Sequence, residues 1–234
     1  MLRAADALDF DNFKDYAIRY FCDKWPDHIQ SVTALRLKYA ADMVLLARRC
    51  SINYVLKRAL YELVRAEGFR QETGPNAEDD DEITSDPSAL SASDYSLLLH
   101  PREQLTDFWM RKAISYPQVS VCISPKESND YENCAITTRR VRLLYITLIH
   151  EESKIFEKYR YDPIGGLNAM YDAPWVSGEK WPSKDVPKSR LCSACGTKWR
   201  NIWDKELGKL WNDLDTWFEL INEDEQDDTE GLRD

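Results

Sequence analysis

The amino-acid sequence predicts a mainly α-helical protein with little or no β structure, and three observations support that prediction. Glycine is scarce, with 8 residues in 234, whereas two-residue β-hairpins favour glycine at positive φ. Apolar residues recur at steps of three and four along much of the chain, which places them on one face of a helix. Aromatic residues make up 12% of the chain and include 8 Trp, so large rings are expected to fill the core.

Residues 1–70 are expected to form two helical hairpins. A shift of 42 positions superimposes similar residues, including Asp11 and Asn53, Ala17 and Ala59, and Phe21 and Leu63. Asp11 and Asn53 are expected to be N-caps, whose side chains accept the free amides at a helix start. Trp25-Pro26 is expected to end the first hairpin, because a proline disfavours the helical conformation in the residue before it. Chance similarity between amphipathic helices is the alternative to a true repeat.

Residues 71–90 and 222–234 are expected to be a disordered acidic loop and a disordered acidic tail. Each segment carries seven acidic residues, and the first contains five in a row, Glu78–Glu82. Such segments cannot bury enough apolar surface to fold. Without them the chain has 27 acidic and 30 basic residues, so the net charge of −10 belongs to these segments. A nucleic-acid partner is not expected, because a binding surface for phosphates would be basic.

Residues 91–221 are expected to form a second helical part. Ser91 and Asp94 have the spacing of a capping box, in which each side chain accepts the amide of the other residue. Pro101 is expected to interrupt the helix that follows, because proline has no amide to donate.

Three further segments complete this part. A helix is expected from Thr138 to Ser153, and residues 160–190, rich in Pro and Gly, are expected to form an irregular connection. The last helix carries an apolar stripe at steps of three and four. Its members are Trp199, Ile202, Trp203, Leu207, Leu210, Trp211, Leu214, Trp217 and Phe218.

The chain is expected to be intracellular and to have no membrane partner. It contains no run of 18 apolar residues, and its first six residues lack the basic and then apolar pattern of a secretory signal. In a reducing compartment, cysteines are more often free thiols or metal ligands than disulfides.

Four of the six cysteines are candidate metal ligands. Two residues separate Cys192 from Cys195, and Gly196 follows, a pattern in which a tight turn presents two thiolates to one ion. Cys122 and Cys134 are the candidates for the remaining ligands, because four thiolates suit tetrahedral Zn²⁺. The eleven residues between them are not a standard spacing. On spacing alone, a zinc site and four small buried hydrophobic side chains are therefore equally acceptable.

The sequence gives no set of residues with a recognisable catalytic spacing. Cys22 and Cys50 lie in helical apolar patterns and are expected in the core, and the three histidines stand apart from Ser, Cys and paired acids: His28, His100 and His150. A non-catalytic protein-interaction module is the favoured function, with partner-binding residues that the sequence does not identify. The alternative is a metal- or thiol-dependent enzyme that uses Cys192 and Cys195, which needs an open coordination position or a lowered thiol pKa.

Five short motifs follow one another along nearly the whole chain outside the acidic loop. They are Leu2-Arg3-Ala4-Ala5-Asp6 with Trp25-Pro26, Leu45-Leu46-Ala47-Arg48 with Ala59-Leu60-Tyr61-Glu62-Leu63, Leu90-Ser91 and Asp94 with Arg102-Glu103, Leu191-Cys192 with Cys195, and Leu210-Trp211 with Leu214, Trp217 and Phe218. In this order they resemble the helical, BACK-like region that follows the BTB (POZ) domain in a divergent group of BTB-domain proteins of mushroom-forming fungi. The BTB domain itself is absent from this chain.

The resemblance implies a partner-binding region of an adaptor and adds no catalytic residue. It implies that four cysteines cluster around one structural zinc ion, with no other cofactor: Cys122, Cys134, Cys192 and Cys195. Self-association and cullin-ligase recruitment belong to the BTB domain in the relatives, so neither is expected of this chain. An exposed groove lined by Tyr171, Trp175 or Trp181 would be a place for a protein partner.

Overall fold

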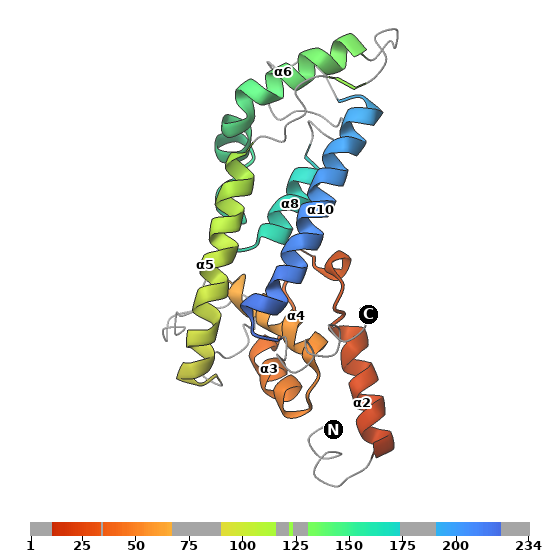
Figure 1. The fold of residues 1–234 in the computed structure, drawn as a ribbon, viewed down its shortest axis with the longest axis vertical. Helices are drawn as coiled ribbons and strands as arrows, with labels where there is room; N and C mark the ends of the chain where they lie inside the picture. The colour runs from red at the N-terminus through yellow and green to blue at the C-terminus, as the bar shows by residue number, and fades with distance from the viewer. Residues whose placement is uncertain are drawn as a thin grey trace, which may run out of the picture. The chain divides into compact units, whose positions relative to one another are not determined.

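The computed structural model describes residues 11–33, 35–66, 90–115, 122–123, 131–173 and 191–220, and within these residues it is mainly α-helical without a strand (Figure 1). The predicted fold class is confirmed. The chain divides into two units, of which the first contains the described residues 11–31, 35–66, 90–102 and 211–220, and the second contains the others. The boundaries lie within α5 (Ala92–Ile114) and α10 (Ser193–Trp217), so residues expected to form one part, 91–221, contribute to both units.

The first unit begins with α2 (Asp11–Lys24) and the short η1 (Ile29–Ser31), followed by a hairpin of α3 (Ala40–Arg49) and α4 (Asn53–Val64). Between the hairpin helices, Ser51 adopts a φ of 54°, and the amide of Ile52 donates to the carbonyl of Ala47 at 2.9 Å. Ile52 is therefore the N-cap of α4, and the N-cap predicted for Asn53 is wrong. The Ile52 side chain is buried.

Helix α4 is buried from Val55 to Val64, and its charged residues are buried with it. Glu62, at 0% exposure, accepts from Arg58 Nε at 3.0 Å and Arg65 Nε at 2.9 Å. It also accepts the backbone amide of Leu37 at 3.2 Å, which ties the segment before α3 to α4. Buried charges are tolerated when they are paired and hydrogen-bonded in this way.

Helix α5 begins as the sequence predicts and continues where a break was predicted. The amide of Ser91 donates to Asp94 Oδ2 at 2.9 Å, and the amide of Asp94 donates to Ser91 Oγ at 3.2 Å, so the capping box is confirmed. The interruption predicted at Pro101 is wrong, because α5 runs through it. The lost hydrogen bond is compatible with a helix anchored on both sides of the proline by buried Leu98 and Leu105.

The described residues of the second unit include α6 (Tyr131–Thr147), the π-helix η3 (Leu148–Glu152), α7 (Ile155–Lys158) and α8 (Pro163–Tyr171). Helix α6 starts before Thr138, where the helix was predicted to begin. The prediction of an irregular connection over 160–190 is wrong for α8. Asp162 caps this helix by accepting the amide of Gly165, and Pro163 occupies the first turn, where its missing amide costs nothing.

Trp109 of α5 is the centre of the packing against α7 and α8. Its ring is fully buried, and Nε1 donates to the carbonyl of Phe156 at 2.9 Å. Gly166 of α8 lies against the six-membered part of this ring, and a Cβ there would come within 2.6 Å of Trp109 Cζ3. Glycine is therefore required at position 166 by close packing.

Several predictions lie outside the described residues. They are the hairpin helix expected before Asp11, the acidic loop apart from Leu90, the acidic tail, and the aromatic residues Trp175 and Trp181. Among the helices that the structure describes, none combines the length and the apolar character needed to cross a membrane.

Candidate metal centre

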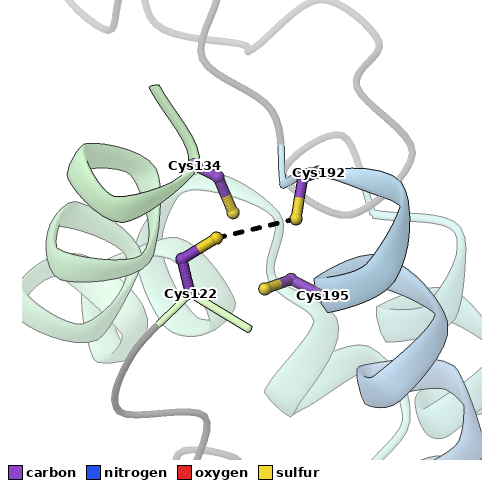
Figure 2. A group of neighbouring side chains, drawn as sticks. All are labelled: Cys122, Cys134, Cys192 and Cys195. Atoms are coloured by element: carbon purple, nitrogen blue, oxygen red, sulfur yellow. Dashed lines mark hydrogen bonds between the residues drawn. The ribbon is translucent and has the colours of Figure 1, made fainter. Parts of the chain in front are cut away.

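Four cysteine sulfurs converge within the second unit. The Sγ atoms of Cys122, Cys134, Cys192 and Cys195 all lie within 4.8 Å of one another, and all four side chains are buried. Figure 2 shows the four side chains pointing toward a common centre. The structure thus brings together the four residues that the sequence analysis selected, although they lie up to 73 positions apart.

The spacing of the sulfurs suits a tetrahedral metal ion and does not correspond to disulfides. A Zn–S bond of about 2.3 Å places the sulfurs of a tetrahedron roughly 3.8 Å apart. The Sγ atoms of Cys122 and Cys192 lie 3.7 Å apart, whereas a disulfide needs about 2.05 Å. All six cysteines are free thiols. The four buried ones could therefore hold a metal ion after only small side-chain adjustments.

Two helix starts supply three of the four sulfurs. Cys134 lies in the first turn of α6, and Cys195 lies in the first turn of α10. The carbonyl of Cys192 accepts the amide of Gly196 at 2.9 Å, which makes Cys192 the residue at the entrance of α10 (Figure 2). Free amides and the helix dipole make an N-terminus a favourable place for negative charge. The two helix starts would therefore favour the thiolate form of cysteines that bind a cation.

Two neighbouring groups support the cysteines. The backbone amide of Ile123 donates to Cys195 Sγ at 3.5 Å. The hydroxyl of buried Thr138 lies 4.0 Å from Cys134 Sγ and donates to the carbonyl of Cys134 at 2.9 Å. The sequence analysis missed both groups. Thr138 could have been found, because a residue four positions after a cysteine lies on the same face of a helix.

Burial raises the pKa of two of the four thiols, Cys134 and Cys195. It raises the pKa of Cys195 to about 11 and raises the pKa of Cys134 well above its usual value. Both thiols are then protonated at neutral pH. A bound cation reverses this preference, since cysteine ligates metals as the thiolate, and metal binding would therefore release protons.

The remaining candidates from the sequence do not join the cluster. Cys22 and Cys50 are half-buried, so their expected place in the core is only partly correct. The thiol of Cys22 contacts Tyr54 Oη at 2.9 Å. His150 lies near Glu157, with Nδ1 3.4 Å from the carboxylate. Tyr171, a candidate groove residue, is half-buried beneath the guanidinium of Arg200.

Comparisons of this chain with protein-family models, with curated proteins and with solved structures find no match. The interpretation of the cysteine cluster therefore depends on its residues and their geometry.

Proposed function

We propose that the chain is a non-catalytic, helical protein-interaction module whose second unit is stabilised by one structural zinc ion. The observation that carries this proposal is the group of four buried thiols with Sγ atoms within 4.8 Å of one another. Coordination of the ion would then hold the start of α6 to the start of α10, in addition to side-chain packing.

Four protein ligands favour a structural role over a catalytic one. Structural zinc sites are closed by four side chains, whereas catalytic sites have three and leave a position for water or substrate. Tetrahedral sulfur sites suit zinc or iron, and zinc is proposed because a structural role needs no redox chemistry.

The alternative of an enzyme that uses Cys192 and Cys195 has less support. Reactive thiols are partly exposed and have a lowered pKa. Cys192 and Cys195 are 6% and 0% exposed, and burial raises the pKa of Cys195 to about 11. Both properties are typical of a structural thiol.

The interaction role rests on the helical scaffold and on the resemblance to the region after the BTB domain in fungal BTB-domain proteins. That resemblance implies a partner-binding region such as that of an adaptor. The proposed partner of this chain is a protein, held on a helical surface whose shape depends on the zinc ion.

Metal analysis combined with thiol titration tests the zinc site. The purified protein is expected to contain about one zinc ion per chain. The four cluster thiols should react only after a chelator is added, whereas Cys22 and Cys50 react without it. A protein without metal, in which Cys192 and Cys195 react freely, would refute the zinc site and favour the thiol enzyme.

Proximity labelling in cells tests the interaction role. The chain and a Cys134→Ser variant, expressed at equal levels, are compared for the proteins that they label. A reproducible set of proteins that is labelled by the chain and lost with the variant is expected. Identical sets for the two chains would overturn the proposed dependence of partner binding on the zinc site.

A further inference from the structure

The four cluster thiols differ in their access to solvent. Cys122 and Cys192 are each 6% exposed, whereas Cys134 and Cys195 are 0% exposed. The more exposed pair therefore consists of one cysteine from the 122–123 segment and one from the entrance of α10.

The same two sulfurs also lie in direct contact. Cys122 Sγ and Cys192 Sγ are 3.7 Å apart, and Figure 2 marks this contact with a dashed line. A disulfide between them needs an S–S distance of about 2.05 Å, so the sulfurs must approach by less than the width of one atom.

We propose that Cys122 and Cys192 are the oxidation-sensitive pair of the centre, and that a peroxide converts them to a disulfide with release of the zinc ion. This inference rests on the proposed zinc site. It adds to that proposal the site of modification and the class of oxidant. It also selects one disulfide from the six pairs that four cysteines could form.

The reaction needs one peroxide for each disulfide. The thiolate of Cys192 attacks hydrogen peroxide, the O–O bond breaks, and the departing hydroxide takes a proton to become water. The thiolate of Cys122 then attacks the sulfenic acid, the S–O bond breaks, and a second hydroxide leaves and is protonated. The same chemistry follows if Cys122 reacts first. Two thiolates lose two electrons, which reduce one peroxide to two water molecules.

Zinc release follows because only two ligands remain. Cys134 and Cys195 alone cannot complete the four-coordinate site of a structural zinc ion. The zinc ion then no longer links the start of α6 to the start of α10, while the disulfide still joins Cys122 to Cys192. Oxidation would thus change how the α6 start is held without unfolding every helix.

A variant that retains only the cluster thiols tests the inference. Cys22→Ser with Cys50→Ser removes the two half-buried thiols and leaves the centre unchanged. The zinc-loaded variant is treated with hydrogen peroxide while a zinc indicator records release and a thiol reagent records the remaining thiols. Proteolysis without reductant, followed by mass spectrometry, identifies the linked peptides.

The expected result is a loss of two thiols for each zinc ion released, a peptide pair joining Cys122 to Cys192, and recovery of zinc binding after reduction. A disulfide between Cys192 and Cys195, or between Cys134 and Cys195, would overturn the inference, and so would oxidation with zinc retained. These outcomes leave the zinc site intact as a proposal. Absence of zinc before peroxide is added would instead refute the proposed function together with the inference.

Discussion

The buried polar groups of the two units differ in their chemistry. In the first unit, buried Glu62 of α4 is surrounded by the guanidinium groups of Arg58 and Arg65. In the second unit, four buried thiols converge at the starts of α6 and α10. The charge network contains both signs within the chain, whereas four thiolates need a cation from solution. The second unit should therefore respond to chelators and oxidants, and the first should not.

The largest effect is expected from removal of a cluster ligand. Cys134→Ser should abolish stoichiometric zinc binding and lower the free energy of unfolding by about 4 kcal/mol or more, because metal coordination is folding energy. Amide hydrogen exchange should rise in α6 and the first turns of α10, while α4 retains its protection. Cys22→Ser is the matched control, with an expected change below about 1 kcal/mol. Equal increases of amide hydrogen exchange in α4 and α6 would contradict the proposed difference between the two units.

The next largest effect is expected at the centre of the charge network. Glu62→Gln leaves Arg58 and Arg65 buried without a counter-charge, and breaking a buried ion pair costs about 3–5 kcal/mol. Asp107→Asn makes the same chemical change in an ion pair with Arg111, whose side chains are 59% and 67% exposed, and should cost less than about 1 kcal/mol. Urea unfolding monitored at equilibrium measures both. Similar losses for the two variants would argue against a special role for the buried network.

Packing around Trp109 should produce an intermediate effect. Gly166→Ala places a methyl group against the Trp109 ring and should destabilise the protein by about 1–3 kcal/mol, the usual cost of overpacking. Gly208→Ala in α10 has open space around the added Cβ and should stabilise by roughly 0.5–1 kcal/mol, because alanine favours a helix. The pair of variants should shift the thermal midpoint in opposite directions. A stabilising Gly166→Ala would contradict the close packing of α8 on Trp109.

The smallest effect concerns a carboxyl group of the first unit. Burial raises the pKa of Asp27 above 3.8, and the negative charge of Asp215 raises it further. The positive charge of Lys57 and a hydrogen bond from Trp211 lower it by less. His28 lies nearby and acts in the same direction as Lys57. Because the folded protein binds this proton more tightly than the unfolded chain, the group stabilises the fold at low pH and loses that contribution as pH rises through its folded pKa.

Asp27→Asn should therefore raise the thermal midpoint slightly at pH 7, and the difference should vanish as pH falls below 3.8. Asparagine retains an oxygen that can accept from Trp211. The midpoint measured against pH for both proteins tests this sign. A variant that is less stable than the native protein at pH 7 would mean that attraction to Lys57 outweighs burial.

Sequence patterns predicted the helices well where the signal was local. The capping box at Ser91 and Asp94 is satisfied entirely by neighbouring residues, so spacing was sufficient to find it. The irregular connection predicted around Pro163 was wrong because a proline costs nothing in the first turn of a helix. The break predicted at Pro101 was wrong because α5 continues through the proline, between buried Leu98 and Leu105. The N-cap predicted at Asn53 was also wrong: Ser51 adopts a left-handed conformation, and Ile52 is the N-cap.

The cysteine cluster and the charge network were predictable to different degrees. Cys192 and Cys195 stand close in the sequence, but spacing could not show that Cys122 and Cys134 lie beside them. The network of Glu62 was missed because charges three and four positions apart look like a solvated helix face. Only the packing of other elements around α4 makes them a buried network. Likewise, the 42-residue repeat remains a prediction, although α2 begins at Asp11 and α4 at Asn53.

X-ray absorption at the zinc edge of the purified protein tests the central claim most directly, because it reports the number and type of atoms bound to the ion. A closed structural centre predicts four sulfur atoms at about 2.3 Å and no oxygen or nitrogen. Three sulfurs with one lighter atom, or a protein that binds no zinc, would contradict a structural centre built from Cys122, Cys134, Cys192 and Cys195.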